Sequence, residues 1–291
     1  MTATARPFDI LASPSLRFSQ NVDYFPIRTL VGFFILNLAG IVFSVVVDSF
    51  GTAWFGTWLP NGFTASWYGQ SWESFQLGGV LIVTLEVVGA VLIGSAVLGV
   101  PAAYALARRD FPGKRAVMLL FLLPLIIPPF TYGIPLASVL YQFGLGGTLT
   151  GVILANLMPS VPFVIFILVP FIEQIDPRVE AAARVFGAGT WALFRSVMVP
   201  LLLPGILAAL VLVLVRTIGL FELTFLTAGP DNQTLVVALY YSVFAAGMRA
   251  NQTIDAMAVI YMVTSLVCLI IALRFVDPTQ IVGRAKKAET H

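Results

Sequence analysis

Few residues in this sequence have side chains that could do chemistry, and the charged ones stand out because they lie inside apolar segments. These are Glu86, Arg216 and Glu222. A charge within a bilayer is costly unless it is paired or wetted, so such residues are candidates for a solute or ion path. With Tyr132 and Asn156 they make up a candidate translocation path, in which Tyr132, Asn156 and Glu222 form a polar strip near the outer half.

Two other interpretations of the three charges stay open. Arg216 could neutralise Glu86 or Glu222 as a buried pair, or the three could relay ions in an ion-driven transporter. Glu222 follows Arg216 at a spacing that places the two on different faces of one helix. We therefore do not expect both side chains to point at one site.

Several kinds of chemistry have no residues to support them. Cys268 is the single cysteine and His291 the single histidine, so there is no disulfide framework and no Cys/His cluster for a metal. No Gly-x-x-x-x-Gly-Lys-Ser/Thr loop, nucleophile elbow or paired His-Glu motif occurs. We expect no catalytic residue, metal or cofactor in this chain; an intramembrane enzyme is the weakest alternative.

The composition predicts that apolar helices in a membrane position these residues. The chain is 59% hydrophobic and 10% charged, its net charge is +2, and no basic tract interleaves with aromatics, which argues against nucleic-acid binding. Mean hydropathy is +0.95. A span needs roughly 20 apolar residues. We predict an all-α integral membrane protein with six spans, near residues 29–47, 76–107, 116–140, 150–172, 199–221 and 254–273.

Basic residues predict the orientation of these spans. With the N-terminus inside, all lysines and arginines except Arg216 and Arg249 fall in cytoplasmic segments, as the positive-inside rule requires. Both termini are therefore expected in the cytoplasm. The expected parts are a cytoplasmic segment (1–28), a first span with a Trp-rich outer loop (29–75), a core of five spans (76–275) and a cytoplasmic tail (276–291).

Four tryptophans lie in the expected outer loop, Trp54, Trp58, Trp67 and Trp72. They are expected to form an interfacial belt or a docking surface for an external partner.

Proline is dense in the third and fourth expected spans, where it should bend the helices, as static kinks or as hinges. These residues are Pro124, Pro128, Pro129, Pro135, Pro159, Pro162 and Pro170.

The longest cytoplasmic loop, about 173–198, predicts a helix, a glycine turn and a second helix. Asp176 before Pro177 is a helix start, and that helix should run to about Phe186. Glu180 and Arg184 are spaced to pair along it. Gly187 and Gly189 should form the turn, and Thr190 should cap the second helix. That helix carries an apolar stripe at Trp191, Phe194 and Val197 or Met198. Pro200 and Pro204 mark its junction with the fifth span.

This loop is the candidate docking site for a soluble subunit. Three alanines leave one part of the first helix without bulk, while Phe186 projects as a knob. The alternative is that a short alanine-rich helix is simply a good helix former on the membrane surface. The candidate coupling residues are Glu180, Ala181, Ala182, Ala183, Arg184, Phe186 and Gly187.

The stretch VEAAARVFGAGTWALFRSVMVPLLLPG resembles the EAA loop of the membrane subunits of binding-protein-dependent ABC importers of the type I fold. That loop reads Glu-Ala-Ala, three residues, Gly, nine residues, Ile, one residue, Leu-Pro. Gly187 and the stretch from Val197 to Pro200 reproduce its second half, whereas Ala181 takes the glutamate position and Glu180 stands one residue early. ALARRDFPGKR, from Ala105 to Arg115, is similar to an inner loop of the same subunits, and the resemblance covers about residues 76–275.

The resemblance implies a multi-pass permease subunit of a bacterial inner membrane. Its loop would dock in a cytoplasmic ABC ATPase dimer, which binds ATP and Mg, and its partners would be a second permease chain, more often a different one, and an external or periplasmic solute-binding protein. TYGIPL and FELTFLTAGP are most similar to the spermidine/putrescine group, which implies a polyamine-like cation or a related small polar organic solute. A sugar or other solute, and an ion-driven secondary transporter, are the alternatives; we see no internal repeat that favours the latter.

Overall fold

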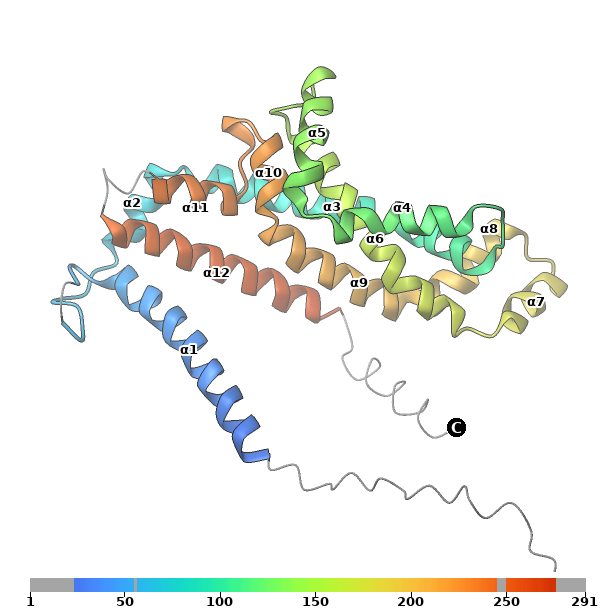
Figure 1. Cartoon of the computed structure of the whole chain (residues 1–291), viewed down its shortest axis with the longest axis horizontal. Coiled ribbons are helices and arrows are strands. Elements are labelled where there is room, and N and C mark those ends of the chain that lie inside the picture. Colours follow the sequence, from blue (N-terminus) through green and yellow to red (C-terminus); the bar gives the residue numbers. More distant parts are fainter. Residues whose placement is uncertain (1–23, 55–56, 245–249, 276–291) are drawn as a thin grey trace, which may run out of the picture. The chain divides into compact units, whose positions relative to one another are not determined.

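The computed structural model describes residues 24–54, 57–244 and 250–275, and these residues are helical with no strand (Figure 1). The chain divides into two units, residues 1–44 and 45–291, which are described separately. The elements are α1 (Tyr24–Phe50), α2 (Ser66–Ser74), α3 (Leu77–Arg108), α4 (Lys114–Ile126), α5 (Pro129–Gln142), α6 (Leu149–Glu173), α7 (Pro177–Val185), α8 (Thr190–Leu193), the π-helical turn η1 (Phe194–Met198), α9 (Val199–Gly219), α10 (Phe221–Thr227), the 3-10 turn η2 (Pro230–Asn232), α11 (Leu235–Phe244) and α12 (Asn251–Leu273).

The first unit contains most of α1. Many of its apolar side chains, among them Leu30, Phe33 and Leu36, are more than half exposed. A predominantly apolar, exposed helix of this length is what a lipid-facing span requires.

Five helical stretches of the described chain are long and apolar enough to cross a membrane. They are Arg28–Phe50, Leu77–Arg108, Leu149–Glu173, Thr190–Gly219 and Asn251–Leu273. The all-helical membrane class is thereby confirmed, with five or six spans according to how the third predicted span is counted.

The third predicted span, near 116–140, is not one straight helix. Its residues form α4 and α5, which meet at an angle of 103° (Figure 1). Pro128 and Pro129 explain the break, because proline donates no backbone bond and disfavours helical dihedrals in the residue before it. Ile127 and Pro128 are accordingly extended, with ψ of 135° and 137°.

The fourth predicted span behaves differently. Pro159, Pro162 and Pro170 lie inside the single uninterrupted helix α6, so an interruption is not found there. Helix α6 packs against α3, α4, α9 and α10. Close neighbours of this kind stabilise a membrane helix whose prolines have removed backbone bonds.

The fifth predicted span begins earlier in the sequence than expected. α8, η1 and α9 form one stretch, Thr190–Gly219, so Pro200 and Pro204 do not separate the loop's second helix from the span. The wider π turn before Val199 precedes Pro200, and such turns occur where a helix must absorb an irregularity. At its C-terminal end α9 stops at Gly219, and the short helices α10 and α11, which the sequence did not predict, follow it.

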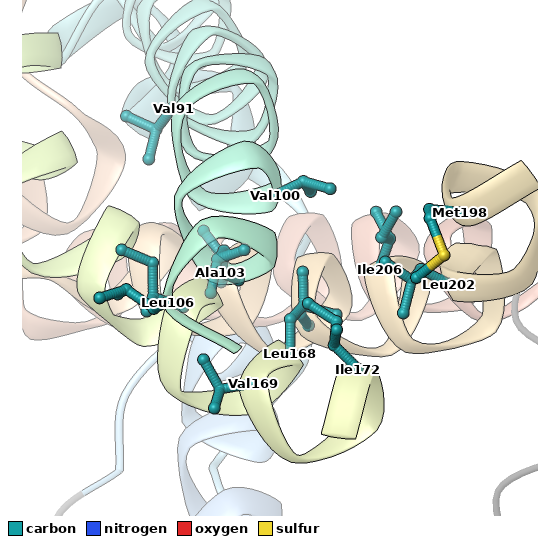
Figure 2. Close-up of a cluster of buried hydrophobic side chains, with 14 of the residues drawn as sticks. Val91, Val100, Ala103, Leu106, Leu168, Val169, Ile172, Met198, Leu202 and Ile206 are labelled. Atoms are coloured by element: carbon teal, nitrogen blue, oxygen red, sulfur yellow. The ribbon is translucent and has the colours of Figure 1, made fainter. Parts of the chain in front are cut away.

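Three helices build the main core. Buried residues of α3, α6 and α9 meet in one cluster, in which Ala103, Leu168 and Val213 are fully buried. Figure 2 shows side chains of this cluster and labels Val91, Val100, Ala103 and Leu106 of α3, Leu168, Val169 and Ile172 of α6, Met198 of η1, and Leu202 and Ile206 of α9. Such packing, more than exclusion of water, holds helices together in a bilayer. The α3–α6–α9 core is therefore the frame that positions the sites below.

Candidate functional site

The loop between α6 and α9 begins with a capped helix, as predicted. The Asp176 side chain accepts a hydrogen bond from the Arg178 backbone N–H at 2.8 Å, and Pro177 is the first helical residue of α7. A carboxylate at the cap satisfies a free N–H group, and a proline there removes no helix bond. Helix α7 ends at Val185, one residue before the predicted end.

The turn after α7 depends on Gly187. Its φ is +84°, a left-handed conformation that strains any other residue type. Its N–H donates to the Arg184 carbonyl at 2.9 Å, which closes the helix end. The predicted cap at Thr190 is wrong, because the extended Gly189 already precedes the helix and its carbonyl accepts from the Leu193 N–H at 2.8 Å.

The tip of this loop is apolar and uncovered. Val185 is 85% exposed, Phe186 90% and Trp191 70%. Ala181 and Ala182 are exposed as well. Clustered apolar side chains on a protein surface mark interaction sites, and Phe186 has the projecting position that the sequence analysis gave it. We call Val185, Phe186 and Trp191 the docking tip.

Glu180 does not form the predicted pair with Arg184. Its Oε1 accepts from Arg108 Nε at 2.6 Å, and its Oε2 accepts from the Tyr104 hydroxyl at 2.7 Å. The side chains of Arg108 and Glu180 are only 14% and 12% exposed. A charge-assisted pair in this sheltered place is stronger than the exposed pair along the helix, which explains the choice of partner.

A second set of polar residues lies within the bundle, where α5, α6 and α10 meet. Asn156 of α6 is fully buried, and its Nδ2 donates to the Val152 carbonyl at 2.9 Å and to Thr224 Oγ1 of α10 at 3.1 Å. Tyr132 of α5 packs against a buried cluster that includes Leu223 of α10. Gly133 permits this approach, since a Cβ there would lie 2.8 Å from the Leu223 side chain.

Two polar atoms of this region lack a hydrogen-bond partner, the buried Tyr132 hydroxyl and Asn156 Oδ1. Elsewhere in the described chain the same holds for Thr217 Oγ1 of α9 and for Thr234 Oγ1 just before α11. A buried polar atom without a partner costs about 1 to 3 kcal/mol, so folded proteins seldom keep one without a reason. We call Tyr132, Asn156, Arg216 and Glu222 the bundle cluster.

The charges within the spans do not form the buried pair that the sequence analysis considered. Within the described ranges Arg216 makes no ion pair with Glu86 or Glu222; its guanidinium lies 5.4 Å from the Phe163 ring centroid. Arg216 and Glu222 both lie close enough to the Tyr132 hydroxyl to act on it electrostatically. Arg216 lies in α9 and Glu222 in α10, with Leu220 between the two helices, so the expected spacing along one helix does not apply to this pair. Glu86 is exposed on α3.

Three residues of these two sites were missed by the sequence analysis. Tyr104 and Arg108 lie within or next to the quoted ALARRDFPGKR stretch, whose basic residues had been used only for orientation. Thr224 stands two residues after Glu222, and a short polar residue there was the available signal.

The tryptophans of the predicted outer loop differ in their environment. Trp54 and Trp67 donate their indole N–H groups to backbone carbonyls, whereas Trp58 is 98% exposed.

Apolar helices long enough to span a bilayer, packed around a common core, define the described chain as a multi-pass helical membrane protein. Solved structures agree on the fold: a bacterial ABC transporter involved in the import of the acidic polysaccharide alginate matches with a TM-score of 0.72 at 17% identity, over 90% of this chain and 99% of that one. The model of the family described as "Binding-protein-dependent transport system inner membrane component" matches residues 95–282. The chain belongs to this family.

Curated relatives narrow the class without agreeing on a solute. The diacetylchitobiose uptake permease NgcG of Streptomyces coelicolor is 35% identical over 52% of this chain, although only 50% of that protein is covered. The molybdenum transport permease ModB of Haemophilus influenzae is 32% identical over 65% of this chain and 89% of its own length. The trehalose transport permease SugB of Mycobacterium tuberculosis is 32% identical over 64% and 67%.

Several expectations are settled by the family. The chain is a non-catalytic, multi-pass inner-membrane component without a cofactor of its own, and it works in a binding-protein-dependent system. The ABC permease resemblance is thus confirmed. Its finer part is not confirmed, because these relatives are named as permeases for molybdenum, diacetylchitobiose and trehalose and do not single out the spermidine/putrescine group.

Proposed function

We propose that this chain is one permease subunit of an ATP-driven ABC importer, which takes a small polar solute from an external binding protein and passes it inward by alternating access. The observation that carries the proposal is the docking tip, a set of exposed apolar side chains on both sides of the glycine turn at Gly187. It would fit a cleft of a cytoplasmic ABC ATPase dimer, which binds and hydrolyses ATP with Mg.

The charge distribution supports a cytoplasmic position for this tip. Arg178, Arg184 and Arg195 lie in its loop, and the α3–α4 connection adds four more basic residues, Arg108, Arg109, Lys114 and Arg115. Inner loops collect such residues, so we place both connections and both chain ends in the cytoplasm.

The bundle cluster is the proposed contact site for the solute. Its free hydroxyl and amide oxygen can bond a polar group in passage, and its residues include one cation and one anion, Arg216 and Glu222. A site with both signs of charge does not by itself select a cation or an anion. We therefore assign the choice of solute to the binding protein, whose affinities for a polyamine, a sugar and an oxyanion are to be measured side by side.

Glu86 supports a second permease chain. It is exposed well inside α3, and a carboxylate facing lipid costs several kcal/mol. A neighbouring permease subunit or a wet path at the subunit boundary would remove that cost. As in the sequence analysis, we expect the second chain to be a different permease more often than a copy.

Substitutions at the docking tip test the proposal. We expect Phe186→Asp, and Gly187→Val through the strain of its positive φ, to abolish co-purification of the ATPase and binding-protein-stimulated ATP hydrolysis, while membrane insertion persists. The matched control is Val179→Asp on the same helix, at a side chain that is 39% exposed. Normal transport by the Phe186→Asp, Gly187→Val double variant would refute the docking role.

A further inference from the structure

We infer that Tyr104 and Arg108 are positioning residues that fasten the docking loop to the inner end of α3, so that α7 and α3 move together when the ATPase displaces the tip. The inference rests on the proposed function of the tip. Neither residue touches solute or nucleotide in this scheme; each acts through Glu180.

Arg108 connects three segments. Its Nε donates to Glu180 of α7 at 2.6 Å, and its NH2 group donates to the backbone carbonyl of Ile175, just beyond α6, at 2.7 Å. Arg108 is itself the last residue of α3. A planar guanidinium holds two acceptors in a fixed geometry, so this one side chain sets the spacing of α3, α6 and α7.

Tyr104 extends the same connection to the base of α9. Its hydroxyl donates to the second oxygen of Glu180 at 2.7 Å, and its ring lies 5.4 Å from that of Phe194 in η1. Phe194 in turn stacks against Trp191 of the docking tip at 6.0 Å. Both halves of the loop, before and after the Gly187 turn, therefore meet at a residue of α3.

No other side-chain bond holds α7 to another helix in the described part of the chain. No α7 residue is fully buried, and its remaining side-chain bond, from Asp176 to the Arg178 N–H, is local. Helix α7 is thus held to α3 by hydrogen bonds and an ion pair at Glu180, whereas Val185 at its C-terminal end is exposed. Helix α3 is the opposite, since Val100, Ala103 and Leu106 are packed into the core next to the anchor.

A displacement of the tip therefore has a short path into the bundle. It passes through Glu180 to Arg108 and Tyr104, then into the packed inner half of α3 and its neighbours α6 and α9. Close-packed helices shift as units, because their interior does not deform continuously. If the anchor is cut, the ATPase should still bind the tip but should no longer move α3.

The experiment uses the whole transporter, meaning this chain with its partner permease, ATPase and binding protein in proteoliposomes. ATP hydrolysis and solute import are measured together, and their ratio is the readout. For Arg108→Ala and for Glu180→Ala we expect the ATPase to co-purify and to hydrolyse ATP, and the solute imported per ATP to fall at least tenfold. The double variant Arg108→Ala, Glu180→Ala should import as much solute per ATP as either single variant, because both substitutions remove the same connection.

The control is Arg109→Ala. Arg109 is adjacent and exposed, and its side chain makes no bond within the described ranges, so the ratio should stay within twofold of wild type. An unchanged ratio in Arg108→Ala, or losses that multiply in the double variant, would overturn the inference. Recovery by the charge exchange Arg108→Glu, Glu180→Arg would add support. Failure of the proposed function itself shows separately, as a wild-type chain that retains no ATPase.

Discussion

Tyr104, Arg108 and Glu180, here called the anchor, are the same three types of side chain as Tyr132, Arg216 and Glu222 of the bundle cluster. The two groups arrange these side chains in opposite ways. In the anchor, Glu180 accepts from both Tyr104 and Arg108 at 2.6 to 2.7 Å. In the bundle cluster the Tyr132 hydroxyl is buried without a partner, and Arg216 lies over an aromatic ring instead of a carboxylate.

The difference separates two uses of polar residues in an apolar protein. A fully bonded network fixes one geometry, which suits a mechanical connection. A buried group without a partner is a standing loss of stability, and it is retained where a passing ligand or water completes it. This contrast fits the two roles proposed above, a mechanical connection for the anchor and solute contact for the bundle cluster.

The two arginines give the largest expected contrast. Arg108→Leu should lower the free energy of unfolding by about 3 kcal/mol, because it leaves the sheltered Glu180 carboxylate without its countercharge. Arg216→Leu should cost under about 1 kcal/mol, the scale of a cation–π contact. Denaturant unfolding of the purified chain in detergent measures both. Equal losses would contradict the distinction drawn between the two sites.

The two tyrosines give a smaller contrast, with opposite signs. Tyr104→Phe removes a hydrogen bond to a charged group and should lower the free energy of unfolding by about 2 kcal/mol. Tyr132→Phe removes a hydroxyl that has no partner and should raise it by about 1 kcal/mol while solute import falls. Parallel unfolding curves and import assays test this, and a loss of stability in Tyr132→Phe would show that its hydroxyl is bonded in the folded chain.

The smallest effect is expected at the other ion pair of the described chain. Lys114 Nζ lies 3.1 Å from Asp110 Oδ1, four residues away on an exposed turn. Asp110→Ala should change the free energy of unfolding by only a few tenths of a kcal/mol, because solvent screens such pairs. The same unfolding assay, repeated at high salt, provides the check; a loss near that of Arg108→Leu would remove burial as the explanation of the anchor's strength.

Local features of this protein were predictable because they depend on neighbours in sequence. The long apolar runs of α3, α6 and α12, the Asp176 cap and the Gly187 turn all follow from residue type and short-range spacing. The pairing along α7 was also a short-range prediction, and it failed. A short-range rule compares Glu180 only with Arg184, whereas the folded chain offered it a better-sheltered partner.

The order of the residues alone was enough to predict that the chain lies in a membrane, that helices build it and that the loop before the fifth span presents a glycine turn with an apolar knob. Each of these features depends on residues that are close together in the sequence. Three features could be known only from the folded chain. They are the partner of Glu180, which is separated from it by 72 positions, the contact of Asn156 with Thr224 across 68 positions, and the break between α9 and α10. These depend on how α3, α6 and α9 pack, and that packing brings distant residues together in ways that spacing along the chain does not encode.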